Sequence, residues 1–529
     1  MSNDKKTPPL VLFVLDGADA GFVERWTSEG SLPTISSIME RGFHGRIGGP
    51  ELMSTQGAWR SLFSGKPRSE HGHYYYQQLV PGTYTIKNGH EDDTHARPFW
   101  YRLQERSKRV AIVDAFEASL VRGLPGVQLT NWGFQQQFGQ PIEPPLSEPG
   151  SFVNEAICLI GAPIHIQVFK PGSTYSEDVD AYHMILKRVE TKGALCRHVL
   201  AQARYDLMVF SFFEAHTVGH RLWDYRPGGS RYGEVRGEAT DLSTAIRDVY
   251  QAIDRELGLL LKQLPEETNV FVLSLFGMKD LYPTYGLIEA FCRRLGYQVP
   301  AHGPAKSQGL LPWIRRTIRP DVRVQLSRFL PQVVRSHLGA DRFHEGTDWT
   351  KTRAFPLPSL QVSFIRVNLR GREPQGIINP GPEYEELLNQ IEADLKDLVD
   401  VQSGKPAVNR VIRTADAFGC GPPSALPDLV VEWRSSSYFM DRITHPKTEL
   451  VQGQHYYHRS SHHTMEGFVV GAGPSIPAKD DLGEFSPLEF APAFLALLDE
   501  PIDHTKSNHL LFRMFPRSFE ATDRVRSES

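Results

Sequence analysis

Short apolar runs rich in β-branched residues, each followed by a polar residue or a glycine, are the feature that most limits the fold of this 529-residue chain. Because these runs do not alternate between apolar and polar residues, they indicate strands of a sheet that is covered on both faces. Helical patterns lie between them, which predicts an α/β sandwich with a mostly parallel central sheet and helices on both faces. The runs are Leu10 to Leu15, Val110 to Val113, Leu207 to Phe213, Val270 to Leu273, Leu429 to Val431 and Phe468 to Val470.

The segments between these runs suggest how the chain is divided. Apolar residues at spacings of three and four predict helices over residues 32–39, 241–264, 384–398 and 487–498. Residues 281–346 are basic and helical in character without strand signals, and we expect them to form an inserted helical cap. The core then consists of residues 1–280 and 347–516, and the polar residues 517–529 are expected to form a flexible tail.

The composition is that of an ordinary globular protein, with 40% hydrophobic and 23% charged residues. A net charge of −4 gives no electrostatic attraction for nucleic acid. The four cysteines are far apart and form no CxxC pair, so they indicate neither a disulfide framework nor a zinc knuckle. No apolar segment approaches the length of a membrane span, and the N-terminal apolar stretch lacks a cleavage site after it. We therefore expect a cytoplasmic enzyme.

Two histidines follow the strand-like run that ends at Phe213. His216 and His220 are four residues apart, so on a helix they lie on one face and can bind one metal ion. They also follow the carboxyl end of a strand, where open α/β sheets place their active sites. Taken alone, the same spacing is equally typical of surface or N-capping histidines.

Other candidate site residues are spread along the chain. Asp16 follows the first strand-like run, although Asp-Gly is also a common turn dipeptide. Thr55 precedes a helical pattern, where a hydroxyl is well placed to attack phosphorus because helix N-termini stabilise anions. Taken alone, the position is more typical of a simple N-cap formed by Thr55 or Ser54. His463, preceded by another histidine, comes just before the run that begins at Phe468.

In their order along the chain, these motifs resemble those of the alkaline phosphatase superfamily, and within it the type I phosphodiesterase/nucleotide pyrophosphatase branch. The family pattern is a strand ending in Asp, then Thr-x-Pro-Ala-Trp, Glu-x-Asp-x-x-x-His, Ser-Asp-His-Gly-Met, and a late His-x-x-x-Gly. The corresponding residues here are Asp16, Thr55 to Trp59, Glu214 to His220, Ser274 to Met278, and His463 to Gly467. The resemblance covers nearly the whole chain and implies an alkaline-phosphatase-like sandwich.

The resemblance implies two metal sites, of which this chain keeps one. The first would be formed by His216, His220 and His463, and three neutral imidazoles are a competent zinc set. At the second site Leu275 and Phe276 stand where the family has Asp and His, and neither side chain can coordinate a cation. Asp16 and Thr55 would be the only ligands left there, so we expect one zinc ion per chain and a second metal is doubtful.

The resemblance also implies the chemistry. Thr55 would attack the phosphorus of a small-molecule phosphate or sulfate ester, and Asp16 would orient or deprotonate it. Glu214 would support the metal site or act as a general base, or it only caps its helix. The predicted function is a metal-dependent phosphate ester hydrolase. Two alternatives remain, a transferase that moves a phosphoryl or sulfuryl group to an acceptor other than water and an inactive protein that binds a ligand or partner. Substrate identity and oligomeric state stay open.

Without a second metal ion, the threonine is activated less strongly unless another cation substitutes, and direct attack by a zinc-bound hydroxide is the alternative route. Lys279 and Arg60 are the candidates that the sequence offers. The residues from His71 to Tyr76 could line the pocket, but three consecutive tyrosines are more typical of a packed aromatic cluster.

Overall fold

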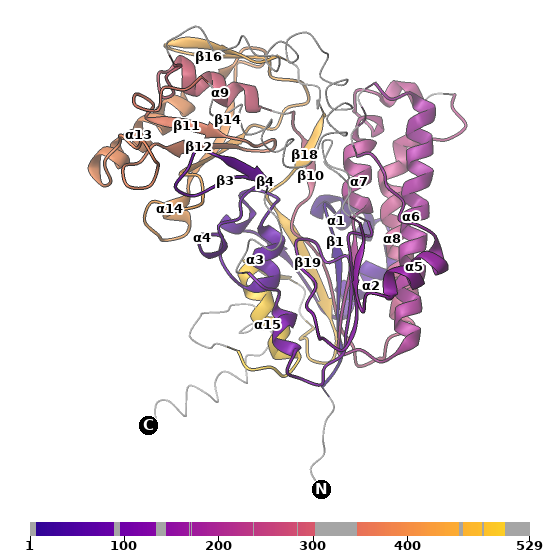
Figure 1. The fold of residues 1–529 in the computed structure, drawn as a ribbon. Coiled ribbons are helices and arrows are strands. Elements are labelled where there is room, and N and C mark those ends of the chain that lie inside the picture. The colour runs from indigo at the N-terminus through magenta and orange to yellow at the C-terminus, as the bar shows by residue number, and fades with distance from the viewer. Residues whose placement is uncertain are drawn as a thin grey trace, which may run out of the picture.

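The structure is a computed structural model. It describes residues 7–502 except for 89–95, 134–143, 169, 171, 236, 283, 302–345, 454–458 and 479–480. A large α/β lobe holds both ends of the described chain, and a smaller lobe lies above it in Figure 1. The predicted tail over 517–529 and most of the predicted insertion over 281–346 lie outside the described residues.

A nine-stranded sheet forms the centre of the large lobe, in the order β20-β2-β19-β9-β1-β8-β5-β6-β7. β19 and β7 run antiparallel to their neighbours, and the other pairs in the sheet are parallel. The predicted mostly parallel sheet is therefore confirmed. Its strands are β1 (Leu10–Leu15), β2 (Phe43–Ile47), β5 (Val110–Val113), β6 (Gly126–Thr130), β7 (Leu146–Glu148), β8 (Leu207–Phe212), β9 (Asn269–Ser274), β19 (Gly467–Ala472) and β20 (Asp481–Phe485).

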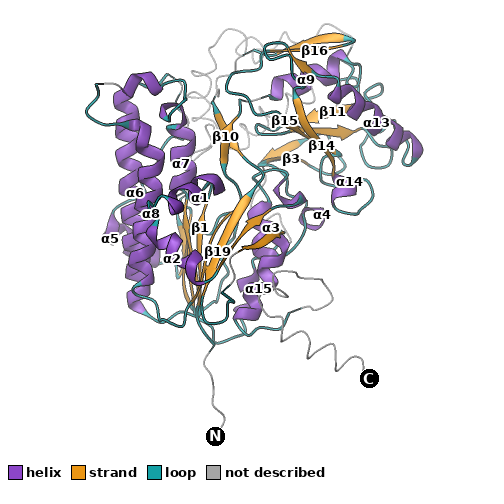
Figure 2. Ribbon diagram, turned by 180° about the vertical axis from the view of Figure 1, so that it is seen from behind, coloured by secondary structure: helices purple, strands orange, loops and turns teal. Residues whose placement is uncertain are grey.

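Helices cover both faces of this sheet, which is why its central strands are apolar throughout. Val11, Phe13 and Leu15 of β1 belong to one hydrophobic cluster, and the alternate residues of the strand belong to a second cluster on the opposite face. The first face is covered by α1 (Ala20–Ser28), α2 (Pro33–Arg41), α5 (Phe152–Ile160), α6 (Tyr175–Gln202), α7 (Glu214–Arg221) and α8 (Ala245–Leu261). The other is covered by α3 (Ala58–Ser64) and α15 (Phe490–Leu497) (Figure 2).

The smaller lobe has its own sheets and its own hydrophobic cluster. The predicted strand over residues 429–431 is real, but it is part of a four-stranded sheet in this lobe and not of the central sheet. The lobe also contains α9, whose residues lie at the start of the predicted insertion. Its elements are α9 (Tyr285–Arg294), β11 (Ala354–Leu357), β12 (Ser363–Val367), α13 (Pro382–Lys396), β13 (Val399–Asp400), β14 (Val408–Arg413), α14 (Thr414–Ala417), β15 (Leu429–Trp433), β16 (Arg442–His445) and β17 (Thr448–Val451).

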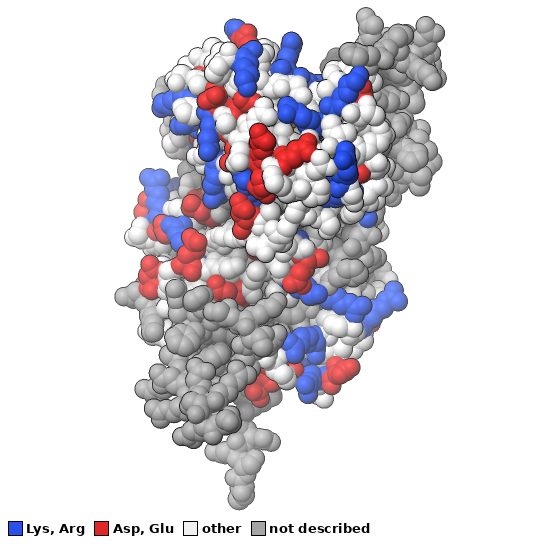
Figure 3. Space-filling model, turned by 90° about the vertical axis from the view of Figure 1, so that its left-hand side faces the viewer, with Lys and Arg blue, Asp and Glu red and all other residues white. Residues whose placement is uncertain are grey.

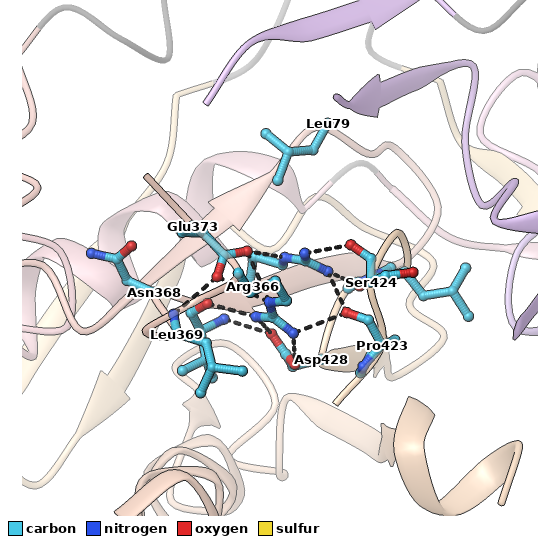
Figure 4. Close-up of polar contacts among 12 residues, drawn as sticks. Leu79, Arg366, Asn368, Leu369, Glu373, Pro423, Ser424 and Asp428 are labelled. Carbon is cyan, nitrogen blue, oxygen red and sulfur yellow. Dashed lines mark hydrogen bonds and ion pairs between the residues drawn. The ribbon is translucent and has the colours of Figure 1, made fainter. Parts of the chain in front are cut away.

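A buried ion network links Arg366 of β12 and the neighbouring Arg372 to Glu373 and to the segment just before β15 (Figure 4). The guanidinium of Arg366 donates to Glu373 and to the backbone carbonyl of Ser424, both at 2.7 Å. Arg372 donates to both oxygens of Asp428, at 2.8 and 2.7 Å. Although burial alone raises the pKa of Asp428, the charge of Arg372 lowers it below its ordinary value. The network satisfies groups that would otherwise be costly to bury.

The two lobes meet at a short antiparallel ribbon of β10 (Met278–Asp280) and β18 (Ser461–His463). β10 follows β9 of the central sheet, and β18 precedes β19, so the ribbon rises from the top edge of the large lobe. On the face drawn in Figure 3, basic and acidic side chains are interspersed over the smaller lobe. Within the described ranges, no helix combines the length and the apolar character that a membrane span requires.

Candidate active site

Asp16 and α7 come together because β1 and β8 are neighbours in the sheet. Leu15 pairs with Phe212 at the carboxyl ends of the two strands, so the residues that follow both strands meet at one edge. Gly17 makes the close approach possible. It has a φ of +68°, and a Cβ there would lie 2.7 Å from the Cβ of His216. The side chains meet as well, with His216 Nδ1 2.6 Å from Asp16 Oδ2.

Three histidines converge at this edge. His216 and His220 lie on α7 and His463 ends β18, and one ring nitrogen of each lies within 4.8 Å of the others. The structure therefore brings together the three residues that the sequence singled out as metal ligands. His220 and His463 are buried and His216 is half-buried. Among the described residues, this is the one group of histidine, cysteine or acidic side chains that could hold a metal ion.

The hydrogen bonds of His220 and His463 fix which nitrogen of each ring faces the centre. His220 Nδ1 lies 3.1 Å from the Ser461 hydroxyl, and His463 Nδ1 lies 3.2 Å from the carbonyl oxygen of Gly277. A carbonyl oxygen can only accept, so His463 carries its proton on Nδ1 and its Nε2 presents a lone pair. The two Nε2 atoms are 3.1 Å apart. Tetrahedral coordination at a Zn–N distance of about 2.05 Å requires about 3.3 Å between ligand nitrogens, which is close to this separation.

Asp16 has the same effect on His216, because its carboxylate can only accept and therefore holds the proton on Nδ1. Burial is the main reason why the pKa values of His220 and His463 lie well below 6.5. Both rings are therefore neutral at pH 7, as metal ligands must be. The residues present fit one divalent cation bound by three nitrogens.

The second metal position of the family pattern is apolar here. Leu275 and Phe276 follow β9 and are 0% and 1% exposed, and both belong to the hydrophobic cluster beneath the sheet edge. Asp16 uses one oxygen for His216 and the other for Trp59, whose Nε1 donates over 3.0 Å. These residues do not fit a second tightly bound ion.

The segment that contains the predicted nucleophile lies beside Asp16, since the bond from Trp59 ties α3 to the end of β1. Thr55 is half-buried, and its hydroxyl donates to the side-chain oxygen of Gln56 at 3.2 Å. Ser54, the other hydroxyl in the motif, is 2% exposed and donates to the carbonyl oxygen of Tyr74. Ser54 is therefore a structural residue, and Thr55 is the less buried of the two.

The remaining predicted residues have structural contacts. Glu214 is fully buried and forms an ion pair with Arg188 of α6 at 2.7 Å, with Lys192 3.9 Å away. Its catalytic role stays a prediction. Tyr74 and Tyr75 pack in an aromatic cluster between the lobes, in which the Tyr74 ring meets Phe364 edge-on.

Sequence reasoning did not find the groups that orient the histidines. Ser461 could have been noticed, because it lies two residues before His463 and so on the same side of a strand. The carbonyl of Gly277 leaves no signal in the sequence at all.

Comparison with known proteins identifies the family. The sequence model of the type I phosphodiesterase/nucleotide pyrophosphatase family matches residues 10–462. The chain belongs to this family. It is thereby a member of the alkaline phosphatase superfamily, as the motif order had indicated, and the family consists of metal-dependent phosphoester hydrolases.

Solved structures with a similar fold share little sequence with the chain. Human ectonucleotide pyrophosphatase/phosphodiesterase 5 is 10% identical, with a TM-score of 0.45 over 96% of this chain and 98% of the other. Phosphonoacetate hydrolase from Sinorhizobium meliloti 1021, in complex with phosphonoformate, is 13% identical, with a TM-score of 0.47 over 93% and 95%. Murine ectonucleotide pyrophosphatase/phosphodiesterase 5, solved as an inactive variant in complex with AMP, is 12% identical. Its TM-score is 0.45 over 95% of this chain and 98% of the other. A search of curated proteins gave no match.

Proposed function

We propose that this chain is a phosphate ester hydrolase that works with a single zinc ion and a threonine nucleophile. The proposal is carried by one observation, the convergence of three histidine nitrogens within 4.8 Å beside Asp16. His216, His220 and His463 would hold the ion. Zinc supplies a Lewis acid that offsets the negative charge developing on the phosphate oxygens.

The other roles belong to the residues of the chain. Thr55 Oγ forms a bond to phosphorus while the bond from phosphorus to the ester oxygen breaks, and the leaving alcohol takes up a proton. Asp16 accepts the proton of Thr55 or orients its hydroxyl. Water then cleaves the bond between phosphorus and Thr55, which restores the hydroxyl and releases the phosphate product. The apolar side chains of Leu275 and Phe276 keep the neighbouring part of the site free of a second ion.

Metal content tests the histidine site. Protein purified without chelator is expected to contain about one zinc ion per chain by elemental mass spectrometry, since the residues form one complete ligand set. His220→Ala should lose this zinc, whereas His198→Ala should keep it, because His198 is a solvent-accessible histidine of α6 that pairs with Glu155. Full zinc in His220→Ala would contradict the three-histidine site. Two ions per chain would mean that other residues rebuild a second site.

Turnover tests the nucleophile. With p-nitrophenyl phosphate and bis(p-nitrophenyl) phosphate as substrates, Thr55→Ala should lose essentially all turnover and keep its zinc, while Thr55→Ser should keep measurable activity because it retains a hydroxyl. A burst of one p-nitrophenolate per chain would report the covalent intermediate. Unchanged turnover in Thr55→Ala would instead indicate direct attack by water.

A further inference from the structure

The two basic residues that the sequence offered as substitutes for the second metal ion both interact with carboxylate groups. Lys279 Nζ lies 3.3 Å from Glu432 Oε1. Arg60 is buried, and its charge acts on Glu117, where it opposes the upward effect of burial on the pKa of that carboxyl group. Neither side chain is placed to give its charge mainly to a substrate. The charge that compensates for the second ion must come from another residue.

Arg459 lies next to the histidine cluster. One of its terminal nitrogens, Nη2, is 3.3 Å from His462 Nε2. The His462 ring in turn lies 5.9 Å from the ring of His220 and 6.1 Å from that of His463, centroid to centroid. Arg459 is half-buried as a residue.

The contact between Arg459 and His462 fixes the protonation of the imidazole. A guanidinium has donors only, so His462 Nε2 must accept, and the proton of the neutral ring resides on Nδ1. This Nδ1 is buried and has no hydrogen-bond partner in the described part of the chain. Buried donors in proteins are nearly always satisfied by protein, water or ligand. An acceptor oxygen is therefore expected beside His462 Nδ1.

We propose that Arg459 is a substrate-binding residue that contacts the negatively charged phosphate group, and that His462 is the positioning residue that holds its guanidinium. This inference rests on the proposed function and specifies its substrate class. The substrate is an anionic phosphate ester with at least one unesterified oxygen, because a neutral triester would gain nothing from the guanidinium. A guanidinium also offers paired donors that match two phosphate oxygens, which the ammonium of a lysine does not.

Binding of inorganic phosphate tests the proposal without knowledge of the natural substrate. Isothermal titration calorimetry would compare wild type with Arg459→Met, in zinc-loaded protein and again in the presence of a chelator, with zinc content measured on the same samples. Loss of a charge-assisted hydrogen bond predicts about tenfold to hundredfold weaker phosphate binding in both states, with unchanged zinc. Arg459→Lys should recover part of this loss. The control is Arg442→Met, which removes an exposed arginine that pairs with Glu449 in the smaller lobe.

The outcomes separate this proposal from the one on which it rests. Equal phosphate affinity in wild type and Arg459→Met would overturn the role of Arg459 while leaving the zinc site intact. Absence of zinc from the wild type would overturn the proposed function, but the affinity ratio in chelated protein would still test Arg459. His462→Phe, which keeps the ring volume and removes the acceptor for Arg459, should weaken phosphate binding in the same direction. If Arg459→Met does not fold, the Arg459→Lys and His462→Phe variants decide, and wild-type affinity in both would overturn the proposal.

Discussion

Asp16→Asn is the substitution that tests the logic of the site most directly. Both oxygens of Asp16 accept hydrogen bonds, one from Nδ1 of the half-buried His216 at 2.6 Å and one from Nε1 of the buried Trp59 at 3.0 Å. Asparagine keeps the shape but has one accepting oxygen, so one of the two donors must face an NH₂ group. If that donor is His216, its proton moves to Nε2, and the nitrogen that should bind the metal is blocked.

The size of the effect follows from this count of hydrogen bonds. One buried donor that loses its partner costs about 1–3 kcal/mol, which corresponds to about 5-fold to 150-fold in an equilibrium constant. The loss should appear as weaker zinc binding if it falls on His216, and as lower stability to urea if it falls on Trp59. Zinc affinity would be measured by competition with a chromophoric chelator. A loss above about a thousandfold would exceed the usual effect of an orienting residue and would identify Asp16 as a direct ligand.

Asp254→Asn is the matched control. Asp254 is 1% exposed, and its two oxygens accept hydrogen bonds from the backbone N–H groups of Thr34 and Ile35. It should lose stability by a similar amount and keep wild-type zinc affinity. Asp16→Asn with both wild-type zinc affinity and wild-type stability would refute the argument that this carboxylate fixes the protonation of His216.

Two further predictions concern pH and charge burial. Burial lowers the pKa values of His220, His462 and His463 in the folded state. Below about pH 6.5 the unfolded chain therefore binds more protons than the folded chain. We expect metal-free protein to lose stability as the pH falls below that value. The loss is at most about 1.4 kcal/mol per histidine and pH unit, and urea midpoints that stay constant between about pH 7.5 and 5.5 would contradict it. Glu214→Gln should destabilise the fold by about 3–5 kcal/mol, because it leaves the buried guanidinium of Arg188 uncompensated. Much of the lost stability should be recovered in the double variant that combines Glu214→Gln with Arg188→Met. If Glu214→Gln instead lost turnover and kept full stability, this would support a general-base role for Glu214.

The fold could largely be predicted because its central strands are covered on both faces and are therefore apolar without interruption. The same signal failed where strands differ from this pattern. β2 alternates between buried and half-buried residues and carries His44 and Arg46, so it does not stand out as an apolar run. An apolar run also does not reveal which sheet it joins, and this is why β15 was assigned to the central sheet. The long helix α6 had an available signal in the capping box of Thr174 and Glu177.

The three candidate metal ligands could be singled out from the sequence because two of the histidines are four residues apart on one helix and the third precedes a strand, and the structure brings them together. Their environment could not. Ser461 is 241 residues from His220, and Gly277 is 186 residues from His463, so these contacts exist only once the ribbon of β10 and β18 has formed. The sequence also does not reveal in which direction a side chain points. Glu214 begins the same helix as the metal-binding histidines, and yet it pairs with a residue of α6.

Leu275 and Phe276 change the charge of the site as well as the number of metal ions that it can hold. One zinc ion, three neutral imidazoles and the carboxylate of Asp16 leave about one net positive charge, whereas a phosphate monoester carries about 1.5 to 2 negative charges at pH 7. A site built only from these groups matches a singly charged diester and leaves part of the charge of a monoester without compensation. In the proposed role, the guanidinium of Arg459, which lies 3.3 Å from His462 Nε2, would supply one further positive charge, and it stays protonated at neutral pH. Because Leu275 and Phe276 cannot be ionised or hold an ion, we expect the balance between the two ester classes to depend on Arg459.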